Sequence, residues 1–113
     1  MIEELMINFL NYHLSAPVYT DKPKKDIPEE YYLMEKTGGS PREHINRSTI
    51  VLQSYAGSRL RASEMIDDAN AAVLHEMIKL DEVSDTELNG SGSFTDTTTK
   101  QYRYQSVFVI THY

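Results

Sequence analysis

A chain of 113 residues has room for one modest hydrophobic core, and we expect a single domain over residues 1–113. The net charge of −6 argues against a dedicated nucleic-acid-binding protein, because phosphate contacts require clustered Lys and Arg. The chain has no cysteine, so it has neither disulfides nor thiolate chemistry. No apolar run approaches the roughly 20 residues that span a bilayer, so we expect no membrane insertion. The first residues are acidic where an export signal needs positive charge, so we expect no export.

The first third of the chain predicts one short helix and two short strands. Residues 2–13 place apolar side chains on one helical face: Ile2, Leu5, Met6, Phe9 and Leu10. Residues 18–20 and 31–35 are rich in aromatic and branched residues, which is typical of strands. Residues 36–47 contain Gly38-Gly39-Ser40-Pro41, and this composition predicts a longer, mobile loop.

The middle third predicts a strand followed by a long helix. Residues 48–55 have a continuous apolar centre, Ile50-Val51-Leu52, so we expect a central strand with both faces covered. Ser58 then suits a helix N-cap, because its hydroxyl can accept a hydrogen bond from an otherwise unpaired amide. A helix of about 22 residues, roughly 33 Å long, should follow. Its apolar stripe consists of Ala62, Met65, Ile66, Ala69, Val73, Met77 and Leu80.

The last third predicts two strands. Residues 85–88 form a weak strand, and Asn89-Gly90-Ser91-Gly92 is a strong turn signal before a polar stretch at 93–100. Residues 102–113 alternate clearly, with one face made of Tyr102, Tyr104, Ser106, Phe108, Ile110 and His112. The order α-β-β-β-α-β-β, with its strands grouped, favours an α+β fold. We expect a mixed, largely antiparallel sheet of about four to five strands, packed by one long and one short helix.

The sequence contains no recognisable catalytic, metal-binding or cofactor-binding motif, so we expect no enzyme, no metal site and no cofactor site. The histidines His13, His44, His75 and His112 lack metal-ligand spacing, and we expect each at the surface or at an edge. Gly38-Gly39 lacks the remaining residues of a phosphate-binding loop. The aromatic residues of 102–113 are typical of core as well as of base stacking, and the acidic chain argues against nucleic acid.

Acidic residues dominate the stretch from Glu64 to Glu87, where Lys79 is the single basic residue. Two interpretations remain open for this stretch. It is either a solvated face that keeps the chain soluble or a surface complementary to a basic partner.

The whole chain, from about residue 2 to residue 113, resembles the tail terminator and tail-completion proteins of long-tailed bacteriophages. The resemblance rests on a succession of features and not on one signature. After the N-terminal helix these are Pro17-Val18-Tyr19, the strand at 31–35, Thr37-Gly38-Gly39, the strand at 48–56 running into Ser58-Arg59, Phe94-Thr95-Asp96 in a polar loop, and Arg103-Tyr104-Gln105 before the closing strand.

The resemblance implies a structural virion protein of the tail or neck region, assembled in the bacterial host cytoplasm. Its subunits would form a ring, usually a hexamer, that caps the head-proximal end of the tail tube and stops tube polymerisation. Its partners would be further copies of itself, the tail tube protein and the head connector or stopper protein, with DNA passing through the ring and no specific nucleic-acid binding.

Five residues are candidates for the subunit or partner interface. The loop at 36–47 is basic in an acidic chain and could meet an acidic neighbour, and the polar loop at 89–100 carries an apolar residue suited to docking. The candidates are Lys36, Arg42, Arg47, Phe94 and Lys100. The alternatives are a head–tail connector or other neck component and a small unrelated protein-interaction adaptor.

Overall fold

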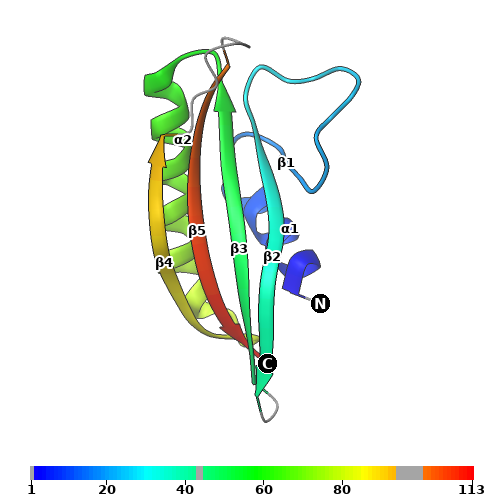
Figure 1. Ribbon diagram of the computed structural model, residues 1–113, viewed down its shortest axis with the longest axis vertical. Coiled ribbons are helices and arrows are strands. Elements are labelled where there is room, and N and C mark those ends of the chain that lie inside the picture. Colours follow the sequence, from blue (N-terminus) through cyan, green and yellow to red (C-terminus); the bar gives the residue numbers. More distant parts are fainter. Residues whose placement is uncertain (1, 43–44, 94–100) are drawn as a thin grey trace.

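The computed structural model describes residues 2–42, 45–93 and 101–113, and it shows one curved sheet with helices packed on one of its faces (Figure 1). The sheet has five strands in the order β1-β2-β3-β5-β4. The strands are β1 (Val18–Tyr19), β2 (Tyr31–Arg42), β3 (Ile45–Ala56), β4 (Val83–Ser93) and β5 (Tyr102–His112). β1 pairs with β2 in parallel and every other described pair is antiparallel, so the predicted α+β fold with a mixed, largely antiparallel sheet is confirmed.

The two predicted helices are present. The short helix is α1 (Ile2–His13), and the long one is α2 (Arg59–Ala71), which continues through a π-helical turn, η1 (Ala72–Glu76), and a 3-10 turn, η2 (Met77–Lys79). Ser58 is the N-cap of α2, since its hydroxyl accepts a hydrogen bond from the Arg61 amide at 3.2 Å. None of the described helices is long and apolar enough to cross a membrane.

The core lies between the helices and one face of the sheet. Side chains alternate along β3 and β5, so that Ile50, Leu52, Phe108 and Ile110 are fully buried beneath the helices. The predicted inward face of residues 102–112 is therefore confirmed. Each of the two helices contributes an apolar stripe to this core: Ile2, Met6, Phe9 and Leu10 from α1, and Ala62, Met65, Ala69, Val73 and Met77 from α2 and its continuation.

Two buried hydrogen bonds fix the long helix to the sheet. The Tyr32 hydroxyl donates to the Met65 carbonyl at 2.7 Å, and the Ser54 hydroxyl donates to the Ala62 carbonyl at 2.8 Å. Both acceptors belong to helical residues, so the hydroxyls join the two layers with directional bonds that apolar packing cannot supply. These contacts set where α2 lies along β2 and β3.

The predictions for two glycine-containing segments are wrong. Residues 36–47 are not a long loop, because β2 continues to Arg42 and pairs with β3 down to the hairpin. Residues 89–92 are not a turn, because β4 continues to Ser93. In each case the glycines accompany a shift in strand register, between Lys36 and Gly38 and between Leu88 and Gly90. The φ angle of Gly90 is +157°, a backbone conformation that residues with a side chain rarely adopt. A β-bulge therefore explains the glycine at this position, just as a turn would.

The expectation that β3 is covered on both faces is also wrong. β3 is central, as predicted, but its second face is only half-buried at Thr49, Val51 and Gln53. Both helices pack on the same side of the sheet (Figure 1), so the other side keeps a partly exposed surface. We call this surface the open face.

Candidate functional site

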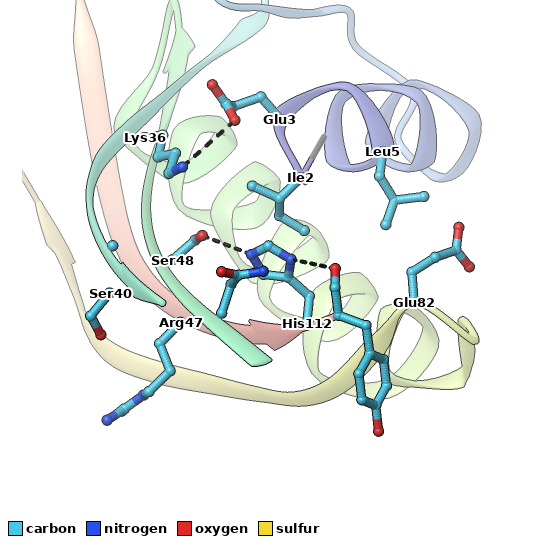
Figure 2. Close-up of a pocket in the computed structure, with 12 residues that line it drawn as sticks. Ile2, Glu3, Leu5, Lys36, Ser40, Arg47, Ser48, Glu82 and His112 are labelled. Atoms are coloured by element: carbon cyan, nitrogen blue, oxygen red, sulfur yellow. Dashed lines mark hydrogen bonds and ion pairs between the residues drawn. The ribbon is translucent and has the colours of Figure 1, made fainter. Parts of the chain in front are cut away.

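A shallow pocket lies at the hairpin end of the sheet, where β2 turns into β3, β4 begins and β5 ends. Its volume is about 510 Å³. The start of α1 contributes Ile2, Glu3 and Leu5 to one wall, and the ends of the strands form the rest (Figure 2). The remaining lining residues are Lys36, Gly39, Ser40, Asn46, Arg47, Ser48, Glu82, His112 and Tyr113.

A buried serine–histidine pair lies at the centre of this pocket (Figure 2). Nε2 of His112 is 2.8 Å from Oγ of Ser48, and Nδ1 is 3.3 Å from the carbonyl oxygen of Tyr113. Because a carbonyl can only accept, Nδ1 donates to it, and in the neutral ring Nε2 then accepts the Ser48 hydroxyl proton. The pair therefore ties β3 to the end of β5.

This position contradicts the sequence-based expectation for His112. We expected a surface or edge histidine, but the side chain is 8% exposed and β5 lies between two other strands. His13 and His75 are exposed, as expected, and His44 lies outside the described residues. The alternation of residues 102–112 placed His112 on the inward face, and this was the one signal in the sequence for its burial.

The geometry of the pair favours a structural role. A serine with a histidine at hydrogen-bond distance is the first part of a nucleophilic arrangement. However, Ser48 is 2% exposed, so its oxygen has almost no surface at which a substrate could approach. Among the described residues, no group of three or more His, Cys, Asp or Glu side chains could hold a metal ion.

The loss of this bond should be measurable. Ser48→Ala leaves a buried histidine nitrogen without its partner, and we expect the free energy of unfolding to fall by about 1–3 kcal/mol. Urea denaturation followed by circular dichroism checks this value. Ser40→Ala, on the exposed part of β2, is the control and should change stability little. Equal stability of Ser48→Ala and the wild type would show that the bond contributes nothing.

Of the predicted interface residues, the structure brings Lys36 and Arg47 to the same pocket. Their side chains leave the sheet on opposite sides, because Lys36 pairs across with the inward residue Ile50 whereas Arg47 precedes the buried Ser48. Nζ of Lys36 is 4.0 Å from Glu3, and a guanidinium nitrogen of Arg47 is 4.0 Å from Glu87. These ion pairs are at least one-third exposed and contribute about 0–1 kcal/mol each.

The other three candidates are less well placed. Arg42 is the last residue of β2, at the same end of the sheet, and not part of a loop. Phe94 and Lys100 lie outside the described residues, so the structure does not test them.

The open face of the sheet is a second candidate surface, which the sequence pattern did not predict. Half-buried apolar residues lie side by side there, since Val51 pairs with Val107 and Thr49 with Val109. Next to them, the Gln53 amide donates to Gln105 at 3.0 Å. An apolar centre with polar neighbours is typical of protein-contact surfaces. The continuous apolar run Ile50-Val51-Leu52 predicts a strand that is covered on both faces. In the structure, only Ile50 and Leu52 of that run are fully buried.

A tyrosine cluster closes the open face at the end opposite the hairpin. The rings of Tyr31 and Tyr55 stack with centroids 4.7 Å apart, and the Arg103 guanidinium lies 5.9 Å above the Tyr55 ring. Tyr31 is fully buried, and burial raises the pKa of its hydroxyl, with a further contribution from Tyr55. The cluster is therefore a rigid, amphipathic border to the apolar centre.

No protein-family model matches the chain, and no curated protein sequence is significantly similar to it.

Proposed function

We propose that this protein is a tail terminator of a long-tailed bacteriophage. Its subunits assemble into a ring, of which a hexamer is the expected form, on the head-proximal end of the tail tube. The ring stops tube polymerisation and presents a docking surface to the head connector. The proposal starts from the resemblance of the sequence over residues 2–113.

One observation from the structure supports it most directly, namely the unequal faces of the sheet. One face packs against both helices, whereas the open face presents half-buried Val51, Val107 and Val109. A partner that covers such a face gains about 25 cal/mol for each Å² of apolar surface removed from water. In an assembly subunit this face is available for contact with another component of the assembly.

The mechanism that follows is geometric. A subunit that binds the last ring of the tube through one surface, and presents an unlike surface on its other side, leaves no site for another tube ring. Head-to-tail contacts that close after a fixed number of copies give such a ring. This role needs no catalytic group, and Ser48 and His112 serve to hold the hairpin end in shape.

Tube assembly in vitro tests the proposal. The tail tube protein is polymerised with increasing amounts of this protein, and tube lengths are measured by negative-stain electron microscopy. We expect shorter tubes with extra density at one end, and rings detectable by light scattering. A connector would bind finished tubes without shortening them, and an adaptor would stay monomeric or dimeric without any effect on tubes, so either result contradicts the proposal.

Two variants locate the contact. Val107→Glu introduces a charge at the centre of the open face, and we expect it to abolish capping while the circular dichroism spectrum stays unchanged. Asp67→Lys, on the exposed side of α2, is the control and should cap as the wild type does. Loss of capping in Asp67→Lys alone would instead favour the acidic helix as a surface for a basic partner.

A further inference from the structure

The sheet has two free edges of similar length. On one side, β4 is the outermost strand, and most of its residues are exposed. On the other side, β1 covers β2 at Tyr32 and Leu33 alone, so from Met34 to Arg42 the outer side of β2 has no strand beside it in the described parts of the chain. Free edges present rows of backbone N–H and C=O groups, which pair readily with another strand.

The directions of these edges permit one sheet to continue into the next. β2 is antiparallel to β3, β3 to β5 and β5 to β4, so β4 runs opposite to β2. A second copy placed alongside, by a rotation about an axis near the strand direction, brings its β2 antiparallel to β4 of the first. Repetition of the same rotation is a heterologous contact that can close into a ring.

Charge favours this pairing over its alternative. The register across the sheet places Asp85 level with Ser40, through Thr111 and Arg47, at the hairpin end. The acidic part of β4, Asp85 and Glu87, is thus level with Ser40 and Gly38, an uncharged part of β2. Two copies of β4 paired about a twofold axis through its regular stretch would instead bring Asp85 and Glu87 of both copies together, and like charges across a strand pair are destabilising. The β2 edge is therefore the better partner for β4.

The register shifts limit how far such pairing can run. β4 is regular between its two shifts, from Asp85 to Leu88, and β2 is regular from Gly38 towards the hairpin. These stretches are level with one another, so the contact would be a short ladder at the hairpin end. Next to it are the pocket and the charged side chains of Lys36 and Arg47.

We propose that β4 of one subunit pairs antiparallel with β2 of the next, so that one sheet runs continuously through the ring. This inference rests on the ring that the proposed function requires. It does not depend on whether that ring stops tube polymerisation or binds the head connector. The second copy of this chain is the occupant of each free edge. The open faces of successive copies then form one surface.

Cysteine cross-linking tests the contact, because the natural chain contains no cysteine. Ser40→Cys on β2 and Ser84→Cys on β4 are near-isosteric changes at exposed positions of the hairpin end. We expect disulfide-linked dimers when the two variants are mixed and oxidised, and none from either variant alone. The double variant should give a ladder of covalent oligomers that ends at the ring size.

The control variant is Ser93→Cys, at the opposite end of β4, which should not link to Ser40→Cys. Links between two Ser84→Cys chains, or equal links from Ser93→Cys, would overturn the proposed pairing. Rings that cap tubes without any link between positions 40 and 84 would overturn it as well and leave the tail-terminator function standing. Links without an effect on tubes would support the pairing and contradict that function.

Discussion

Phe108→Ala should lower the free energy of unfolding by about 3–5 kcal/mol, the range for removing a fully buried aromatic ring. Phe108 is fully buried in β5, and it pairs with Ile50 on one side and with Leu88 on the other. The cavity would open between the sheet and α2, where neither layer can collapse without moving the other. Urea denaturation measures the loss, provided that the unfolding free energy falls with urea concentration at the same slope in the variant and in the wild type.

The next residue of the same strand provides the control. Val109 points to the open face and is half-buried, so Val109→Ala should cost about 1 kcal/mol. Both changes leave the β5 backbone pairing intact, and they differ in which face loses its side chain. Equal losses would show that the open face is packed as tightly as the helical face, and would remove the main support for an assembly surface.

Stability should fall steeply above pH 10 because of the buried tyrosines. The pKa of the Tyr32 hydroxyl is raised above its usual value of 10.0, mainly because burial disfavours the phenolate and then because Asp68 lies near it. The folded protein thus keeps a proton that the unfolded chain loses at pH 10. The stabilisation is complete below pH 10, and above it the free energy of unfolding should fall by about 1.4 kcal/mol per pH unit for each such tyrosine.

Substitutions of single tyrosines show which of them cause the loss of stability above pH 10. Tyr32→Phe should flatten the decline above pH 10, and at neutral pH it should cost about 1 kcal/mol through loss of the bond to Met65. Tyr31→Phe should also flatten the decline, but at little cost at neutral pH, since its buried hydroxyl makes no hydrogen bond of good geometry within the described residues and interacts only weakly with the Gln101 side chain. Tyr12 is 85% exposed, and Tyr12→Phe should leave the profile unchanged. An undiminished slope in Tyr32→Phe would refute the assignment.

The sequence predicted the order and type of the elements because each carries a strong local pattern. The apolar spacing of α1 and α2, the N-cap at Ser58 and the alternation of residues 102–112 all correspond to what the structure shows. The lengths of β2 and β4 were underestimated. Gly38 and Gly90 mark turns by composition, but here pairing with β3 and β5 extends the strands and each glycine accompanies a register shift.

The candidate site was less predictable than the fold, since it depends on contacts between distant residues. Ser48 and His112 are 64 residues apart, and neither has a neighbour in sequence that predicts the bond between them. Lys36 and Arg47 were chosen as loop residues, and the structure places both on strands that end at the same pocket. The free edges of β2 and β4 follow from strand order, which the linear pattern of apolar residues does not encode.

The strand order also has a consequence for how the chain folds. β5 comes last of the five strands in the chain, yet it lies between β3 and β4. Until β5 has left the ribosome, β3 lacks one of its neighbours and β4 lacks the strand on which it pairs, and the hydrophobic stripe of α2 lacks part of its cover. The side chains of Gln53 and Gln105, which bond across β3 and β5, are 52 residues apart, so closing this pair carries a large loop entropy. A chain that ends before residue 102 therefore lacks the strand on which both β3 and β4 pair, so the sheet can close only after residues 102–112 have been synthesised.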